Sequence, residues 1–412
     1  MSAEQHQVII IGGGPAGLGA ALRLREQGIE DILILERERE PGGILRQCIH
    51  DGFGLTRFGE TLSGPEYAQR FVDRVAEKGI PCVTGCTVLD LTADKVITAA
   101  RAGEIKQYRA QAVVLAMGCR ERTRGALAIP GSRPAGVYTA GVAQNYVNLR
   151  NIMVGREVVI LGSGDIGLIM ARRMTLEGAK VKGVYEVMPY PSGLPRNMEQ
   201  CLNDYGIPLH LSHTVIDIRG RERLEAVVTA RVDERMRPVP GTEEVVPCDT
   251  LILSVGLIPE NELSLAAGVR LDGRTKGAWV DENCQTSIPG VFAAGNVLHV
   301  HDLVDFVTLE SEALADCAAR YLREGRLPPC PLEVKAGAGV GHVIPQYVSG
   351  TRDFTLSLRV RAPLRDATLT VTQNGRTLLS RKLRRALPAE MLQLPIKGDK
   401  LEQSGDLEVN VG

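Results

Sequence analysis

The hydrophobic pattern near the start of the chain repeats later. Residues 8–11 are four apolar β-formers in a row, and from Leu18 to Gly28 apolar positions recur about three and four apart. The first pattern predicts a buried strand, and the second predicts a helix with one buried face. The same strand–glycine–helix order returns from residue 158 to Glu186. Strands that alternate with helices in this way are typical of an α/β fold with parallel sheets.

Beyond residue 350 the hydrophobic period shortens to two. Asn374-Gly375 in this part is a strong hairpin signal. We therefore expect a small all-β domain, a sandwich or barrel, over residues 351–412. A Pro/Gly-rich linker at residues 329–350 would lead into it. The residues that would share the buried face of its first strand are Phe354, Leu356, Leu358 and Val360.

The glycines after the first strand form a dinucleotide-binding loop. Gly12 permits a tight turn, Gly14 lets the backbone approach a pyrophosphate, and Gly17 lets the helix lie close to the strand. The helix N-terminus would then present free N–H groups to the phosphates. Glu36 closes the next strand and would accept hydrogen bonds from an adenosine ribose.

The second loop repeats this design in register. Gly162, Gly164 and Gly167 follow the strand, and Glu186 ends the next strand. The distance from Gly162 to Glu186 is 24 residues, as it is from Gly12 to Glu36. A carboxylate there favours a free ribose 2′-OH, and no arginine follows it, so the loop predicts NAD rather than NADP. The alternative is a copy that keeps the fold but binds another adenine nucleotide, or none.

Two further stretches resemble parts of a known family. Residues 112–125 are a buried strand with a small-residue turn, and residues 291–294 are a strand ending in Gly295-Asn296, with a helix from near Asp305. This order of motifs resembles the pyridine nucleotide-disulfide oxidoreductase superfamily of two-domain flavoproteins, over residues 6–326. The resemblance implies two Rossmann-like domains, with FAD at the first loop and NAD at the second.

The resemblance and the loops together assign domains and cofactor contacts. The FAD domain would be residues 1–122 and 278–328, with the NAD domain, residues 123–277, inserted in it. Asn296 stands where the family has aspartate, although an amide can still hydrogen-bond. Val307 and Thr308 are the expected backbone donors to the flavin. The FAD residues would be Gly12, Gly14, Pro15, Ala16, Gly17, Glu36, Gly42, Gly43, Ala116, Gly118, Gly295, Asn296, Val307 and Thr308, and the NAD residues Gly162, Gly164, Asp165, Ile166, Gly167, Glu186 and Gly256.

Four stretches are similar to one subgroup of this superfamily: GGILRQCIHDGFGL, AMGCRERTRGALAIPGSRPAGVYTAG, SVGLIPENELS and GNVLHVHDLVDF. The subgroup comprises FAD/NAD-dependent subunits found with a glycerol-3-phosphate-dehydrogenase-like flavoprotein and a small cysteine-rich protein. More distant similarity reaches the larger subunits of opine oxidases, hydroxyproline and proline dehydrogenases, and cyanide synthase. The resemblance implies that a partner subunit oxidises the substrate while this chain carries the electrons.

Cys48 lies where flavin-dependent disulfide reductases keep a pair of cysteines. A redox cystine needs two sulfurs at short spacing, and Cys48 has no such neighbour, so disulfide reductase activity is not expected. Cys48 could be a buried structural thiol, a peroxidase thiol that cycles through sulfenic acid, or a contact of flavin or substrate. His50 could donate a proton to reduced flavin or be purely structural.

A second polar group precedes the flavin-facing helix. It comprises His299, His301, Asp302 and Asp305, and either aspartate could cap the helix. No further part of the chain matches metal-ligand spacing, so the sequence predicts no metal site.

Composition adds exclusions. The formal net charge is −1, which gives no electrostatic support for nucleic-acid binding. No apolar run reaches the roughly 18 residues of a membrane span. The first residues lack the pattern of a secretory signal, and the nine scattered cysteines are typical of a reduced, cytoplasmic protein. Arginines cluster from Arg359 to Arg385, as a solvated face or as a docking surface for an acidic partner.

Overall fold

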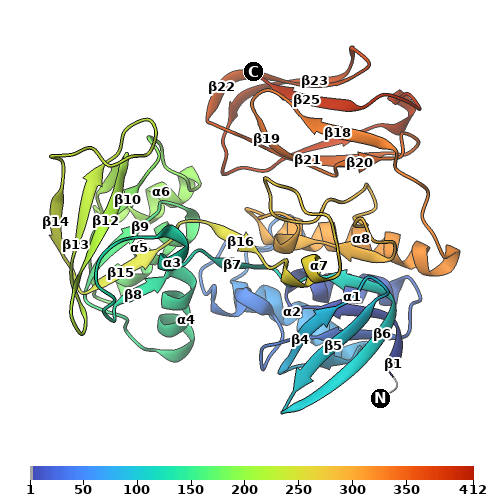
Figure 1. Cartoon of the computed structure of the whole chain (residues 1–412), viewed down its shortest axis with the longest axis horizontal. Coiled ribbons are helices and arrows are strands. Elements are labelled where there is room, and N and C mark those ends of the chain that lie inside the picture. Colours follow the sequence, from blue (N-terminus) through green and yellow to red (C-terminus); the bar gives the residue numbers. More distant parts are fainter. Residues whose placement is uncertain (1–2) are drawn as a thin grey trace. The chain divides into compact units, whose positions relative to one another are not determined.

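The structure is a computed structural model that describes residues 3–412. The chain divides into two compact units, which are considered one at a time. The first unit comprises Met1–Cys119 with Pro259–Gly412, and the second comprises Arg120–Ile258. The boundaries fall at β7 (Cys119–Glu121) and β16 (Leu257–Pro259). Two Rossmann-like folds and an all-β C-terminal region confirm the predicted fold class (Figure 1).

The first unit contains a seven-stranded sheet in the order β3-β2-β1-β6-β5-β4, with β17 paired to β6. β1 pairs in parallel with β2 and β6, whereas β4, β5 and β6 form an antiparallel meander. The strands are β1 (Glu4–Ile11), β2 (Ile32–Leu35), β3 (Cys82–Val83), β4 (Cys86–Leu91), β5 (Val96–Arg101), β6 (Glu104–Leu115) and β17 (Val291–Ala293). The helices are α1 (Pro15–Glu26), η1 (Gly43–Gln47), α2 (Gly64–Glu77), α7 (Glu262–Ala266), η3 (Gly295–Val297) and α8 (Val304–Glu324).

The apolar run of β1 is buried on both faces, which is why it does not alternate with polar residues. Val8 and Ile10 pack with α1, α2 and α8 in one core cluster. Ile9 and Ile11 pack on the opposite face with residues of β4, β5 and residues 267–280. This double burial fixes the end of β1, and with it the position of the first glycine loop.

The second unit repeats the arrangement. Its parallel sheet has the order β11-β10-β9-β15-β8, and a separate antiparallel sheet has the order β12-β13-β14. Val158 and Ile160 of β9 face the helices, while Val159 and Leu161 face the antiparallel sheet. The strands are β8 (Val137–Thr139), β9 (Glu157–Leu161), β10 (Lys180–Glu186), β11 (Leu209–Leu211), β12 (His213–Gly220), β13 (Leu224–Arg231), β14 (Glu244–Pro247) and β15 (Thr250–Leu253). The helices are α3 (Arg124–Leu127), α4 (Ala140–Arg150), α5 (Asp165–Leu176), α6 (Pro195–Cys201) and η2 (Asn203–Tyr205).

The C-terminal part of the first unit is a two-sheet β structure around one core cluster. The sheets have the orders β20-β18-β25-β22-β23 and β19-β21-β24. The four apolar residues predicted to share a face of β21 are all buried, and Asn374-Gly375 turns with positive φ at both residues, as the hairpin signal predicted. The elements are β18 (Leu332–Ala336), β19 (Val340–Ile344), β20 (Tyr347–Val348), β21 (Phe354–Val360), β22 (Leu364–Gln373), β23 (Arg376–Ala386), β24 (Leu392–Ile396), η4 (Gly398–Lys400) and β25 (Leu407–Val411).

The structure differs from the expected domain limits at two places. Residues 329–350, expected as a linker, contain β18, β19 and β20. Most of their apolar residues pack in the C-terminal core cluster, and β18 lies parallel to β25, which is far along the chain. Residues 259–277, expected in the NAD domain, group with the first unit. There Asn261 donates to the carbonyl of Val297 at 2.8 Å, and Val269 lies in a core cluster of that unit.

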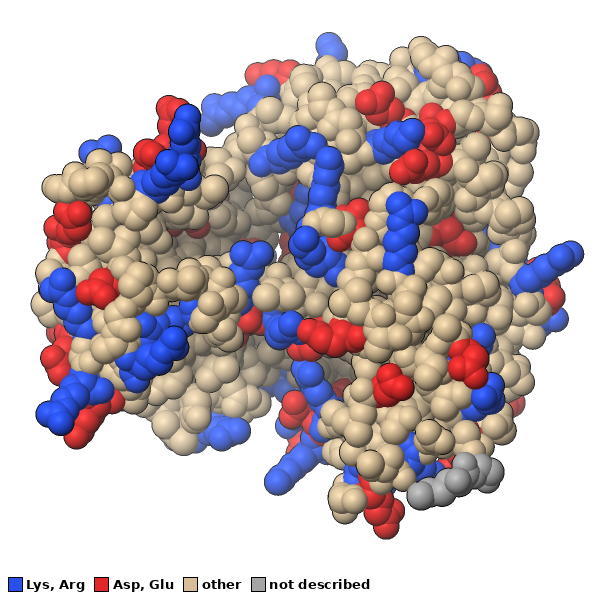
Figure 2. All heavy atoms as spheres, in the orientation of Figure 1, with Lys and Arg blue, Asp and Glu red and all other residues tan. Residues whose placement is uncertain are grey.

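The surface carries both charges. Figure 2 shows lysine and arginine side chains interspersed with aspartate and glutamate on the face in view, in keeping with the near-zero net charge. The exposed basic residues of the edge strand β23 are Arg376, Arg381, Lys382, Arg384 and Arg385. No helix within residues 3–412 has the length and apolar character needed to cross a membrane.

Candidate functional site: two dinucleotide cradles

The first glycine loop has the backbone geometry that a bound diphosphate requires. Gly12 has φ of 111°, and a side chain there would meet the carbonyl of Ala116. A Cβ on Gly17 would collide with the carbonyl of Gly12, so helix α1 can lie this close to β1 only with glycine. Gly14, in contrast, has only the Cα of Gly43 nearby, at 3.8 Å from an added Cβ. The loop is thus closely packed behind and open at Gly14, where a phosphate would approach.

The N-terminus of α1 is electrostatically suited to an anion. Gly14 is its N-cap without a side-chain hydrogen bond, Pro15 is its first residue, and the first turn contains no acidic residue. The N–H of Leu18 is used within the helix, on the carbonyl of Gly14. The N–H groups of Ala16 and Gly17 therefore belong to the unsatisfied donors of the first turn, which attract phosphate. The residues present fit an FAD diphosphate.

Glu36 is buried at the end of β2 and retains acceptor capacity. Its Oε2 accepts from the N–H of Gly13 at 2.5 Å, and its Oε1 accepts from the N–H of Glu38 at 2.7 Å. A carboxylate has about four lone-pair sites, so two remain for ribose hydroxyls. Glu36 therefore fits the ribose-binding role that the sequence predicts.

Gly42 and Gly43 lie against the loop itself. The N–H of Gly42 donates to the carbonyl of Gly13 at 2.7 Å, and a Cβ on Gly43 would come within 2.9 Å of the Cα of Gly14. Both glycines have positive φ. They allow the chain to lie against the loop at Gly13 and Gly14 and to begin η1, which leads to Cys48.

Cys48 ends η1 in a packed position. Its Sγ donates to the carbonyl of Ile44 at 3.4 Å, and Gly64 at the start of α2 packs on its backbone. Burial raises the pKa of the Cys48 thiol to about 12. A thiolate is the reactive form, so this environment opposes nucleophilic chemistry at neutral pH. All nine cysteines of the chain are thiols.

His50 lies in the loop after Cys48. Its Nδ1 is 2.9 Å from the carbonyl oxygen of Asp51, and its ring packs against Phe53. The loop is held to α8 by the buried Asp305, whose carboxylate accepts from the N–H groups of Gly54 and Thr56 at 3.1 and 2.9 Å. Asp305 therefore holds this loop in place. It does not cap the helix, although the sequence left that role open. Asp302 does not cap it either, because Leu303 is the N-cap residue.

The late strand β17 places Gly295 and Asn296 beside β6. Gly295 has φ of 75°, and a Cβ there would press on Ala16. The Oδ1 of Asn296 accepts from the N–H of His301 at 3.0 Å, and its Nδ2 is 3.6 Å from the Sγ of Cys119. Ala116 and Gly118 follow β6 in the same unit. The FAD residues on β1, β2, β6 and β17 thus occur at one end of one sheet.

The helix that follows β17 begins close to Asp305, as the sequence predicted. Helix α8 starts at Val304, so the N–H of Thr308 already lies inside the helical hydrogen-bond ladder. The Thr308 hydroxyl accepts from Tyr67 at 2.8 Å, and Val307 is buried against Gly295. The side chains of Val307 and Thr308 are buried, and the role of their backbone N–H groups as donors to the flavin stays a prediction.

The second loop has the same backbone. Gly162 has φ of 101° and packs on the carbonyl of Ser254; an added Cβ on Gly167 would come within 2.5 Å of the carbonyl of Gly162. Gly164 has an added-Cβ distance of 3.8 Å to Ser254 Oγ and begins α5 without a side-chain cap. The steric pattern is that of the first loop, glycine for glycine.

The polar groups of the second loop differ. Asp165 occupies the first turn of α5, where the first loop has Pro15. Its Oδ1 accepts from the N–H of Leu194 at 2.8 Å and from Asn197 at 2.7 Å. A segment after β10 is thereby held over the start of α5, and Ile166 follows inside the helix. Gly256 has φ of 101°, and its carbonyl accepts from the N–H of Arg122.

Glu186 accepts more hydrogen bonds from the protein than Glu36 does. Its Oε2 accepts from the N–H of Ser163 and from the hydroxyls of Ser163 and Ser192, at 3.0, 2.6 and 2.9 Å. Its Oε1 accepts from the N–H of Met188 at 2.9 Å. Three of the four donors are on Oε2, so the lone-pair sites of that oxygen are filled, whereas Oε1 keeps one site. A ribose hydroxyl at this site would therefore bind Oε1.

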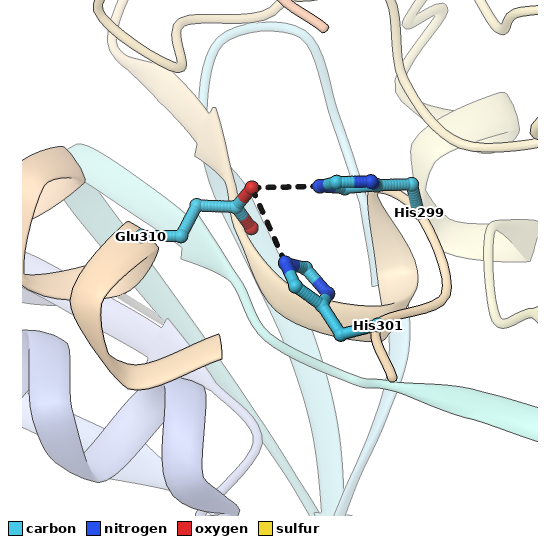
Figure 3. A group of neighbouring side chains, drawn as sticks. All are labelled: His299, His301 and Glu310. Carbon is cyan, nitrogen blue, oxygen red and sulfur yellow. Dashed lines mark hydrogen bonds and ion pairs between the residues drawn. The ribbon is translucent and has the colours of Figure 1, made fainter. Parts of the chain in front are cut away.

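The structure also brings together a cluster that sequence spacing did not reveal. His299 and His301 precede α8, and Glu310 is on its second turn (Figure 3). Burial lowers the pKa of His299, with His301 acting in the same direction. Burial alone would raise the pKa of Glu310, but His301 and His299 hold it well below its usual range.

Comparison with known proteins agrees with this arrangement. Residues 6–318 match the family model described as pyridine nucleotide-disulphide oxidoreductase. The NAD(P)H sulfur oxidoreductase (CoA-dependent) of Pyrococcus abyssi is 29% identical over 72% of this chain and 64% of its own length. An opine oxidase subunit of Agrobacterium tumefaciens is 27% identical over 71% of this chain and 61% of its own length. The chain thus spans less than two thirds of the length of either relative.

The fold is similar to that of a solved structure. The thioredoxin reductase of T. acidophilum has a TM-score of 0.63 and 23% identity, and the match covers 77% of this chain and 98% of that chain. This likeness concerns the fold. The chain belongs to the pyridine nucleotide-disulphide oxidoreductase family.

Proposed function

We propose that this chain passes electrons between FAD at the first loop and NAD(H) at the second, as one subunit of a cytoplasmic multi-subunit dehydrogenase. The observation that carries the proposal is the pair of glycine loops with matching backbone, each followed by a buried glutamate. Bound FAD would supply hydride chemistry, with the protein providing orientation and electrostatics. Gly12, Gly14 and Gly17 would hold its diphosphate, and Glu36 its adenosine ribose.

Anaerobic addition of NADH to the purified protein tests this electron transfer. We expect the yellow flavin absorbance to bleach, and to bleach faster with NADH than with NADPH because of Glu186. A flavin that stays oxidised with both nucleotides would contradict the transfer step and favour a structural second site. A protein that cannot be loaded with FAD at all would remove the whole proposal.

The subunit role rests on similarity. One relative above bears the name of a subunit of an opine oxidase. We propose that a substrate-oxidising flavoprotein, and a small cysteine-rich protein, associate with this chain, and that the substrate is of the glycerol-3-phosphate or amino-acid type. Isolation from the native host under mild conditions, followed by addition of candidate substrates, tests this. A chain that elutes alone and reacts directly with such a substrate would contradict it.

A thiol-based reductase is the second candidate, because another relative is named as a sulfur oxidoreductase. We do not expect disulfide reduction, because Cys48 has no second cysteine at short spacing and burial raises the pKa of its thiol. The Cys48→Ser variant should therefore reduce an artificial dye with NADH as the wild-type protein does. Cys82→Ser, a thiol of the same unit that is also partly buried, is the matched control.

Thiol chemistry would give the opposite pattern. Turnover with a disulfide, persulfide or peroxide would occur in the wild-type protein and vanish in Cys48→Ser but not in Cys82→Ser. Reduction of the flavin by NADH would survive in both variants. This result would overturn the assignment of Cys48 as a packing residue.

A further inference from the structure

Two histidines and a glutamate lie together in the first unit, near the N-terminal end of α8. The Nε2 of His299 is 2.8 Å from Oε1 of Glu310, and the Nε2 of His301 is 3.5 Å from the same oxygen. Figure 3 shows a ring nitrogen of each histidine directed at this carboxylate. Two imidazole nitrogens and one carboxylate oxygen therefore converge from different segments, the loop after η3 and helix α8.

These groups are removed from water. The side chains of His299, His301 and Glu310 are 1%, 3% and 15% exposed. The Nδ1 atoms of both histidines are buried and lack a hydrogen-bond partner among residues 3–412. Burying the two Nε2 atoms and the carboxylate costs free energy unless a strong interaction offsets it. A purely apolar interior would have been the cheaper solution at this position.

The carboxylate is already oriented. The second oxygen of Glu310 accepts from the N–H of Gly295 at 2.7 Å. Carboxylates that bind metals are typically fixed by such outer hydrogen bonds. Oε1 of Glu310 is thus held facing both rings.

The spacing of the three atoms suits a metal ion. Zinc bonds of about 2.0–2.1 Å to nitrogen and oxygen place ligand atoms about 3.3 Å apart in a tetrahedron. The observed separations of 2.8 and 3.5 Å from the carboxylate oxygen lie on either side of that value. All three ligand atoms lie within 4.8 Å of one another, so rotations of the side chains would have to bring them to the tetrahedral spacing.

We propose that His299, His301 and Glu310 bind one divalent transition-metal ion, Zn²⁺ or Fe²⁺. Two imidazoles and one carboxylate are a donor set that both ions accept, with positions left for water. The ion would join the loop of residues 295–303 to α8 and would offset the buried negative charge. The inference does not depend on the proposed electron transfer, because it concerns metal content alone. Ligand spacing in the sequence did not indicate this site, because Glu310 follows His299 by 11 residues.

Metal content of the full-length, FAD-loaded protein tests the proposal. Protein purified without added metal, or dialysed against a chelator and titrated with Zn²⁺ or Fe²⁺ (the latter anaerobically), should bind about one ion per chain. Elemental mass spectrometry and titration calorimetry measure this without interference from the flavin colour. Glu310→Gln keeps the size and the acceptor for Gly295 but removes the charge, and should weaken binding by more than about 100-fold.

The control and a second variant keep the test decisive. His301→Asn should lose the ion as Glu310→Gln does, while His213→Asn, a histidine of the second unit, should retain it. Flavin absorbance and circular dichroism report whether each variant is folded. Wild-type protein that takes up neither ion, or that binds it equally well in the Glu310→Gln and His301→Asn variants, would overturn the proposal and leave a metal-free hydrogen-bond network.

Discussion

The two glycine loops share a backbone but differ in the state of their polar groups. Glu36 accepts two hydrogen bonds from the protein, and Glu186 accepts four. The first turn of α1 has no acid, and the first turn of α5 has Asp165. The glycine spacing therefore specifies the cradle, whereas the side chains around it decide how readily it accepts a nucleotide. By this measure the first loop leaves more acceptor sites for a ribose than the second loop does.

The largest effect is expected from replacing Gly14 and Gly164, the glycine of each loop that has free space beside it. Gly14 and Gly164 have φ of −83° and −65°, which valine tolerates, and an added Cβ at either has no contact closer than 3.8 Å. Both variants should therefore fold. Gly14→Val should emerge colourless, because its side chain fills the diphosphate position. Gly164→Val should stay yellow but lose bleaching by NADH.

Visible spectra and anaerobic NADH titration measure both outcomes, with circular dichroism to confirm folding. A yellow Gly14→Val variant with normal FAD content would show that the first cradle does not hold the diphosphate at Gly14. Loss of FAD in Gly164→Val would instead show that the two loops are not independent.

A medium effect on NADH binding is expected from removing one of the hydrogen-bond donors to Glu186. Ser192→Ala removes the hydroxyl that donates to Oε2 but leaves the backbone unchanged. Oε2 then accepts from two donors instead of three, so the carboxylate becomes a better acceptor for a ribose hydroxyl, and the dissociation constant for NADH should fall by about two- to fivefold, less than the net value of one hydrogen bond to a charged group. Titration calorimetry measures it, with Ser132→Ala in the same unit as control. An unchanged or higher dissociation constant would mean that Glu186 does not bind the ribose.

The smallest effect concerns acid sensitivity of the second unit. Burial lowers the pKa of His210, whose ring stacks on Tyr185 at 4.6 Å. The unfolded state then binds more protons than the folded state below about pH 6.5, so this contribution to stability is lost as the pH falls. His210→Phe should keep the stacking and reduce the drop in melting temperature between pH 7.5 and 5.5 by about 1–3 °C. A drop in melting temperature as large as that of the wild type would show that His210 does not contribute to this acid sensitivity.

Local chemistry explains what could be predicted from the sequence. Glycines whose neighbours leave no room for a Cβ, such as Gly17 and Gly167, indicate their turns directly. The strands before them are buried on both faces and therefore occur as unbroken apolar runs. The hairpin at Asn374-Gly375 was equally predictable, because positive φ at two successive residues restricts the choice of residue.

Features that depend on distant segments were not predictable. Ser192 reaches Glu186 only because the segment after β10 folds back over α5. Glu310 joins the two histidines only through the turn between η3 and α8. Strand β18 lies in a region rich in proline and glycine, and its partner β25 is far along the chain. No local period records such pairings.

The division of the first unit has a consequence for biosynthesis. Strand β6 receives β17 at residues 113–115 only after the whole second unit has been translated. Until then the nascent first half exposes an unpaired strand edge and lacks helix α8 over its core, a state prone to aggregation. The second unit, encoded without interruption, can mature in the meantime. Expression at low temperature or with added chaperones should therefore benefit this protein more than a redesign in which the two halves of the first unit are contiguous.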